Sequence, residues 1–412
     1  MGKRTTFRLR ALALAFLAGC LASCAGAKRS DTGWTTSVDT LPNGALHVVN
    51  TPPSDGGTPQ WTLEEELRIG SETADSPDLF GRLAGLEVLA DGRIAVLEAQ
   101  TQQVRIFGPD GTHLATFGGE GEGPGEFKHP LGMMRDAQDR LWVADVSNAR
   151  MSIMDATAGF QRSFPLHLMR FGFMWNGVIM NDGRMIKWSL TLGPPRRDVY
   201  RVRNDSMRTV DSIPVPPAVP YGGGGQSTFA FRSDHGGSYY SIPFRADDQR
   251  IFDPRGGTWS SVGGDPTYRV IRWTPDRDTT LVMETRRRPV PVTTAEKDSA
   301  IAFIKDRTKA YGDVEQDWSL IPSVRPGVKR LFLAENGELW VQTPVEGGGI
   351  LYDRYDDSGQ YLGSITSDLH VYEWVFPVVR GDTFWAVVTD EFDVPYVVRA
   401  KIVATGSAGG SS

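Results

Sequence analysis

Cysteine is almost absent from this chain, which has two among 412 residues, Cys20 and Cys24. Beyond residue 24 the chain therefore has no internal disulfide and no thiol nucleophile. Positive charge is also in the minority, with 44 Lys and Arg against 50 Asp and Glu. The formal net charge is −6, and residues 1–10 carry four of the basic side chains. This balance argues against a nucleic-acid partner, because phosphate contacts need a basic surface.

The apolar run near the N-terminus, residues 11–19, is too short to cross a bilayer. It follows a basic segment and precedes small residues, which predicts a cleaved signal peptide over residues 1–23. Residues 17–20 and 21–24 each resemble the bacterial lipobox. The resemblance implies that Cys20 or Cys24 becomes a lipidated N-terminus. Cys20 completes the more usual motif and Cys24 leaves a longer apolar segment, so both assignments stay open.

A lipidated cysteine predicts an exported protein that is anchored in the cell envelope and contacts a membrane through its lipid. By analogy with enterobacterial sorting, an aspartate after the cysteine retains a lipoprotein in the inner membrane. Leu21 or Ala25 would hold that position here, which favours the outer membrane. Residues 25–56 are rich in small polar residues, Pro and Gly, and we expect a flexible tether there with one short strand at 46–49. Residues 405–412 are predicted to be a disordered tail.

Glycine, by contrast, is plentiful at 46 residues, which indicates many tight turns and short strands. The clearest unit is the Asp-Gly phrase at 89–96, followed by an apolar run at 104–107 and a Pro-Asp-Gly turn at 108–111. Such turns between alternating apolar runs are hairpin signals, because Gly adopts the positive φ that they require. The phrase returns at 139–145, 182–186, 336–341 and 381–386, with a weaker copy at 237–241.

Six such units, each with room for about four strands, predict an all-β fold, a six-bladed β-propeller over residues 57–404. The last unit lacks a fourth strand, and the apolar-polar run at 61–69 has no partner of its own. We expect 61–69 to close the ring, which would remove an open strand edge. An insertion at 285–327, between blades four and five, contains a predicted helix. Its start is a capping box formed by Thr293 and Glu296. This helix either packs on the propeller or forms a lid over a pocket.

The residues at 117–127, 141–145 and 148–150 resemble the NHL-repeat pattern, and the whole chain resembles bacterial six-bladed propeller lipoproteins of that superfamily. In such propellers, ligands usually bind at the face formed by the loops between strands two and three and between blades. Long excursions at 213–227, 244–266 and 285–328 are predicted to lie on this face. Candidate ligand-binding residues on the same face are Glu98, Asp145, Asn148, Arg150, Arg245 and Asp390. In NHL-type blades, however, residues such as Asp145, Asn148 and Arg150 commonly brace the loop.

The six histidines show no paired metal-ligand spacing. His129, His167 and His370 each precede an expected inner strand, so they are weak candidates for a metal site. The leading hypothesis is a monomeric, cofactor-free binding or scaffolding module, not an enzyme, for a peptide, glycan or protein. The alternative, which the superfamily resemblance implies, is a metal-dependent lyase or lactonase-like hydrolase with calcium or zinc at the channel mouth.

Overall fold

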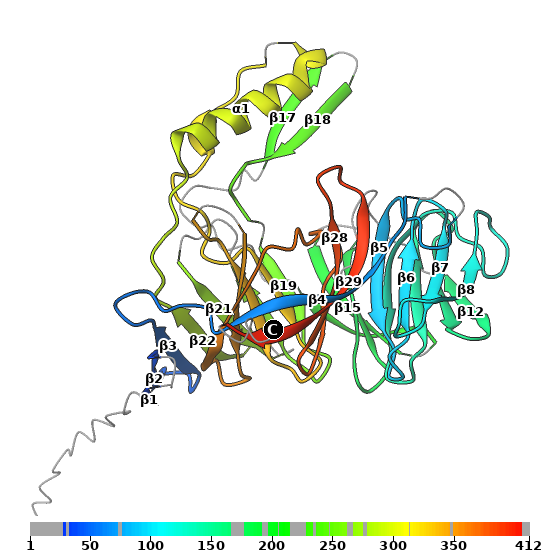
Figure 1. The fold of residues 1–412 in the computed structure, drawn as a ribbon, viewed down its shortest axis with the longest axis horizontal. Coiled ribbons are helices and arrows are strands. Elements are labelled where there is room, and N and C mark those ends of the chain that lie inside the picture. The colour runs from blue at the N-terminus through cyan, green and yellow to red at the C-terminus, as the bar shows by residue number, and fades with distance from the viewer. Residues whose placement is uncertain are drawn as a thin grey trace, which may run out of the picture.

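The computed structural model shows a six-bladed β-propeller with a small module standing off one face (Figure 1). It describes residues 28–29, 33–72, 76–165, 177–191, 197–204, 206–214, 228–233, 236–246, 248–261, 267–274, 278–312, 314–346 and 349–405. The predicted signal peptide, both cysteines, His167 and residues 406–412 lie outside this part of the chain, as does most of the 213–227 excursion.

Each blade is an antiparallel sheet whose strands run in sequence order from the propeller axis outward. Blades one to three consist of β5 (Leu83–Val88), β6 (Ile94–Glu98), β7 (Gln103–Phe107) and β8 (His113–Gly118); β9 (Pro130–Arg135), β10 (Leu141–Asp145), β11 (Arg150–Asp155) and β12 (Gly159–Pro165); and β13 (Val178–Ile179), β14 (Met185–Thr191), β15 (Arg197–Arg203) and β16 (Thr209–Pro214). Blades four to six contain β19 (Gln249–Phe252), β20 (Thr258–Ser261), β21 (Arg269–Trp273) and β22 (Thr279–Thr285); β23 (Arg330–Leu333), β24 (Leu339–Thr343), β25 (Ile350–Tyr355) and β26 (Tyr361–Ser367); and β27 (Val378–Arg380), β28 (Thr383–Thr389) and β29 (Pro395–Ala404).

The second strands of blades one, two and five are buried along their whole length. They read as nearly continuous apolar runs because neighbouring blades cover both of their faces. The hydrophobic core is accordingly divided into clusters between blades. Leu97 and Val104 of blade one, for example, pack with Met133 and Val143 of blade two. The blades are held together chiefly by this apolar packing.

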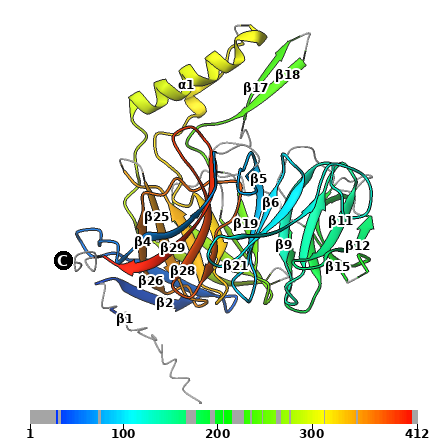
Figure 2. The same cartoon turned by 45° about the vertical axis from the view of Figure 1, so that its right-hand side comes forward.

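The ring closes through β4 (Trp61–Ile69), as predicted. This strand pairs antiparallel with β29 from Trp61↔Ala404 to Ile69↔Val397 and so becomes the outer strand of blade six. Its first residues also pair with β26 of blade five. Strands β4 and β29, from opposite ends of the propeller sequence, therefore lie side by side in one blade (Figures 1 and 2), and unfolding of either strand would open the ring.

The prediction of a flexible tether over 25–56 is wrong for much of that segment. Strands β2 (Thr35–Thr40) and β3 (Leu46–Thr51) form a hairpin, and β3 adds to blade four by parallel pairing with β22. The two-residue strand β1 (Lys28–Arg29) pairs with β2. Trp34 explains why this segment is structured and not flexible. It is 1% exposed and stacks on Tyr361 of blade five with ring centroids 3.8 Å apart. We call β2 and β3 the N-terminal hairpin.

Blade four begins later than the sequence repeat suggested. In blade one the first turn is closed by hydrogen bonds from Leu89 N to Arg93 O and from Gly92 N to Leu89 O. The same pair of bonds recurs in blade four around Asp253, from Asp253 N to Gly257 O and from Gly256 N to Asp253 O. The weaker copy at 237–241 is therefore not part of a blade, and residues 249–261 form the first hairpin of blade four instead of a loop within it.

Residues 237–241 instead belong to the module that stands off the propeller (Figures 1 and 2). The module joins the hairpin β17 (Thr228–Ser233) and β18 (Gly236–Ser241) to α1 (Thr294–Thr308), η1 (Lys309–Tyr311) and η2 (Trp318–Leu320). The predicted helical insertion between blades four and five is confirmed, capping box included. Its buried partners lie on β17 and β18, where Phe229 and Phe231 pack with Ile304 and Ile321. In the described residues, no helix combines the length and hydrophobicity that a membrane span requires.

Candidate binding site in the central channel

A cavity of about 550 Å³ follows the propeller axis. Its walls come from the innermost strand of every blade, β5, β9, β13, β19, β23 and β27, and from residues next to them. We call the end near the first turn of each blade, such as residues 89–93, the turn end. The opposite end, where the inner strands begin, is the loop end, and the hairpin–helix module stands on that side (Figure 2).

The inner strand of blade six is interrupted by a bulge. Val371 pairs with Val388, and Val378 pairs with Trp385. The six residues 372–377 thus lie opposite only two, 386 and 387. A bulge re-aims side chains, and bulges concentrate beside functional sites. This one places Trp374 and Phe376 on the cavity wall, 57% and 46% exposed. Large aromatic side chains with this much accessible surface inside a channel offer an apolar contact to a ligand.

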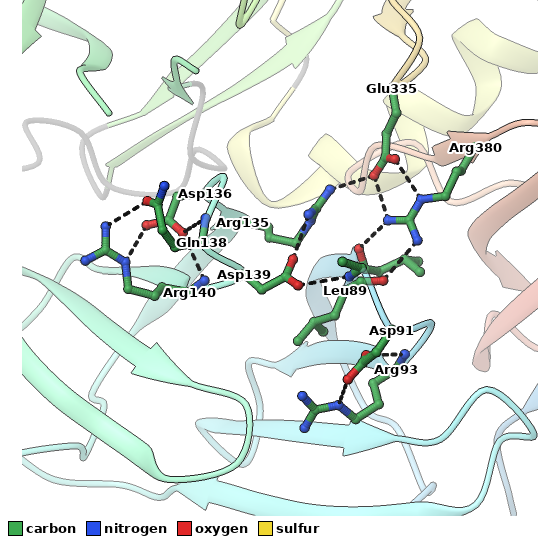
Figure 3. Close-up of polar contacts among 12 residues, drawn as sticks. Leu89, Asp91, Arg93, Arg135, Asp136, Gln138, Asp139, Arg140, Glu335 and Arg380 are labelled. Atoms are coloured by element: carbon green, nitrogen blue, oxygen red, sulfur yellow. Dashed lines mark hydrogen bonds and ion pairs between the residues drawn. The ribbon is translucent and has the colours of Figure 1, made fainter. Parts of the chain in front are cut away.

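A network of charged side chains occupies the turn end of the channel (Figure 3). At its centre, the Glu335 carboxylate of blade five accepts hydrogen bonds from Arg135 of blade two at 2.6 Å and from Arg380 of blade six at 2.7 and 2.8 Å. Burial alone would raise the pKa of Glu335, but the two guanidinium groups outweigh it and hold the pKa below its usual value. Glu335 is therefore ionised at neutral pH.

Blade one is tied into the same network. Arg380 donates to the backbone oxygens of Val88 and Leu89, each at 2.9 Å. Asp139 accepts from Arg135 at 2.7 Å and from the backbone N–H of Ala90 at 3.1 Å. Four of the six blades thus meet through these charges at the turn end (Figure 3). Bidentate and charge-assisted bonds of this kind fix relative geometry, so the network gives the channel a rigid polar end.

Glu87 of β5 lines the cavity beside this network. Burial raises the pKa of Glu87 to about 7, and the nearby Glu335 carboxylate adds to the rise; the charge and backbone N–H of Arg135 oppose it. A carboxylate with this pKa is partly protonated at neutral pH. Such groups gather at functional sites, because binding and catalysis use them.

Glu98, a predicted ligand-binding residue, is fully buried at the end of β6. Its carboxylate accepts from the backbone N–H groups of Arg82 at 2.7 Å and Thr101 at 2.5 Å, and from the Thr101 hydroxyl. Burial tends to raise the pKa of Glu98, but these hydrogen bonds bring the pKa below its ordinary value. The side chain joins the start of blade one to the loop after β6.

Asp145, Asn148 and Arg150 brace a loop in the same way. Asp145 is fully buried and accepts from the backbone N–H groups of Lys128 and His129 and from the Asn148 amide. Asn148 and Arg150 donate to backbone oxygens within the Gly-rich segment 121–126. The NHL-like motif residues therefore hold the connection between blades one and two. Their proposed role in ligand binding stays a prediction.

The other predicted residues do not converge on one point. Asp390 follows β28 and accepts from the backbone N–H groups of Phe392 and Val394, each at 2.9 Å. Arg245 lies between β18 and β19, outside the cavity lining. His129 lies beside Asp145 and His370 beside β28. Within the described part of the chain, no three His, Cys, Asp or Glu side chains are grouped to hold a metal ion. The metal-dependent alternative stays a prediction.

Sequence reasoning missed Glu87, Trp374 and Phe376. The sequence at 371–378 reads as one inner strand, although Pro377 removes a ladder donor from it. That proline was the one available signal of the bulge. Glu87 carried no signal, because it alternates with Leu86 and Val88 like any polar residue on a strand.

Neither a protein-family model nor a curated protein matches the sequence. Solved structures match it in fold. A member of the DUF4221 family from Bacteroides vulgatus has 10% identity and a TM-score of 0.49 over 84% of this chain and 99% of that chain. PQQ-bound aldose sugar dehydrogenase from Streptomyces coelicolor has 9% identity and a TM-score of 0.42, covering 84% and 100%. Virginiamycin B lyase from Staphylococcus aureus has 11% identity and a TM-score of 0.37, covering 92% and 94%. At these levels the likeness concerns the fold alone.

Proposed function

We propose that this chain is an exported, lipid-anchored propeller that binds a peptide, glycan or protein segment in its central channel, entered from the loop end. The observation that carries the proposal is the bulge of blade six, which exposes Trp374 and Phe376 to the cavity. The cavity volume of about 550 Å³ lies in the range of ligand pockets. The ionic network at the opposite end favours entry from the loop side.

The proposed anchor rests on the lipobox-like residues and on the N-terminal hairpin. Nine residues separate Cys24 from Trp34, which is fixed against blade five. An extended chain covers at most about 3.5 Å per residue, so a lipid on either cysteine would hold the edge of blade four close to the membrane. The proposal also treats blades one and two as NHL-type repeats, because their residues 117–127, 141–145 and 148–150 resemble that pattern.

Channel binding is tested by a thermal-shift screen of peptides and glycans against the protein lacking its leader. We expect ligands that raise the melting temperature of the wild type, with the shift lost in Trp374→Ala and Phe376→Ala. A matched control is Phe392→Ala, which removes another exposed aromatic side chain in the loop between β28 and β29, outside the cavity lining. Ligands whose shift survives both channel substitutions would refute the channel as the site.

The anchor is tested by metabolic labelling with palmitate in cells that express wild type, Cys20→Ser, Cys24→Ser or the double variant. Loss of label in one single variant identifies the modified cysteine. Label that persists in the double variant contradicts lipid anchoring.

A further inference from the structure

Glu87 differs from the other charged side chains of the channel wall. Across the described residues, each of the others has an oppositely charged partner within ion-pair distance. These pairs are Arg135–Asp139, Arg135–Glu335, Asp136–Arg140, Asp253–Arg255 and Arg250–Asp248, the last at 4.0 Å. Glu87 has none, and its carboxylate is satisfied only by the backbone N–H of Arg135. A carboxylate inside a protein is stabilised by a partner of opposite charge, and here that place is open.

The groups facing Glu87 do not fill this place. Arg135 directs its guanidinium to Asp139 and Glu335. Arg380 uses all of its guanidinium nitrogens on Glu335 and on two backbone oxygens of blade one. Three carboxylates, those of Glu87, Glu335 and Asp139, thus share two guanidinium groups. Among these five groups, negative charge exceeds positive charge by one when Glu87 is ionised.

The aromatic bulge suits the same ligand. A cation is attracted to the face of an aromatic ring, and most strongly to tryptophan. Phe376 already has the Arg330 guanidinium over its ring, 4.2 Å from the centroid. Trp374 has no ring or cation contact in the described residues, and more than half of its surface is accessible. Its face is available to a ligand in the cavity that Glu87 also lines.

We infer that the channel recognises an organic cation, an amine with an apolar or aromatic body, through the Glu87 carboxylate and the Trp374 ring, with Phe376 as an apolar wall. The inference rests on the proposed function, since it names the ligand class of the same channel. A free metal ion fits less well, because hard cations take six or more oxygen ligands and Glu87 offers two. An anionic ligand would instead meet the Glu87 carboxylate, which has no ion-pair partner among the described residues.

The inference has a pH dependence of defined sign. In the free protein Glu87 loses its proton near pH 7, whereas the ion pair between Glu335 and Arg380 keeps the pKa of Glu335 below and that of Arg380 above its usual value. Only ionised Glu87 attracts a cation. Affinity for an amine should therefore rise about tenfold from pH 6 to pH 8, in step with the ionised fraction of Glu87.

Three probes that share a phenyl ring and a two-carbon spacer separate charge from shape: 2-phenylethylammonium, 2-phenylethanol and 3-phenylpropionate. Their binding to the leader-free protein is titrated by ligand-observed NMR at pH 6 and pH 8. We expect the ammonium to bind tightest at pH 8 and the propionate weakest. Glu87→Gln should reduce ammonium affinity by about tenfold or more, because a charge-assisted hydrogen bond is lost, and should leave the alcohol unchanged. Glu64→Gln, on an exposed position of β4, is the matched control, and thermal melts verify folding of each variant.

Each outcome decides between the two proposals. Equal binding of the three probes, or an ammonium preference that survives Glu87→Gln, overturns the cation inference; if Trp374→Ala still weakens all three, binding in the channel stands. Binding that Trp374→Ala and Phe376→Ala leave unchanged places the ligand elsewhere and overturns both. No binding of any probe overturns the cation inference, and the thermal-shift screen of peptides and glycans then decides separately on binding in the channel.

Discussion

Glu87→Gln should stabilise the propeller, and the gain should grow with pH. In the folded protein the pKa of Glu87 rises from its ordinary value of 4.5 to about 7. Between these two pH values the folded state keeps a proton that the unfolded state releases. Stability conferred by the wild-type side chain is therefore fully present below about pH 4.5 and is lost as pH rises to about 7. Glutamine has the same shape and no charge, so it avoids this loss.

The size of the effect follows from the shift. Each pKa unit corresponds to about 1.4 kcal/mol, and the difference in wild-type stability between pH 5 and pH 8 from this one group is about 2.5 kcal/mol at most. Access of cavity water to the carboxylate reduces the figure. For a domain of this size, 1 kcal/mol shifts the melting temperature by about 1–2 °C. The melting temperature of Glu87→Gln relative to wild type should thus rise by up to about 5 °C from pH 5 to pH 8.

The assay is differential scanning calorimetry of both proteins at pH 5, 6, 7 and 8. The quantity compared is the variant-minus-wild-type difference, because ionisation of all other groups largely cancels in it. Glu64→Gln measures the effect of removing one exposed negative charge. A Glu87→Gln difference that is the same at every pH would refute the reasoning, since it would mean that Glu87 titrates alike in the folded and unfolded chain.

Three further substitutions test the scaffold. Asp145→Ala should cost about 2–4 kcal/mol, because the buried backbone N–H groups of Lys128 and His129 lose their acceptor, and urea unfolding would measure it; a midpoint equal to wild type would contradict the bracing role. Deletion of Trp61–Ile69 should lower the melting temperature of the whole propeller, and an unchanged melting curve would contradict closure by β4. Trp34→Ala should release the N-terminal hairpin, so limited proteolysis should cut within residues 35–51 faster than in wild type; equal cleavage rates would show that strand pairing alone holds it.

The sequence predicted two parts of the fold: the hairpins that repeat from blade to blade, and the closing strand, whose run at 61–69 had no neighbouring strand to pair with. The repeat phrases at 89–96, 139–145 and 336–341 predicted the strands of blades one, two and five, because tight turns restrict the backbone locally. The run at 61–69 was recognisable as the closing strand because blade six lacked its outer strand. Blade four was misplaced because its first turn reads Pro-Arg-Gly-Gly after Asp253, whereas 237–241 mimics the repeat with a Gly-Ser pair before two tyrosines. The backbone hydrogen bonds around Asp253 identify the first turn of blade four, and the amino-acid sequence alone does not.

The candidate site was beyond reach for a different physical reason: its members meet only when the ring closes. Glu87 lies on blade one and Trp374 on blade six, almost three hundred residues apart in the sequence, and no local pattern links them. Polar residues in loops, such as Asp145, attract attention because loops usually carry function. Here the Asp145 carboxylate accepts hydrogen bonds from the backbone N–H groups of Lys128 and His129, and these bonds hold the connection between two blades. Among the described residues, the channel-wall acid that lacks an ion-pair partner is Glu87, on an inner strand, and we propose that a cationic ligand pairs with it there.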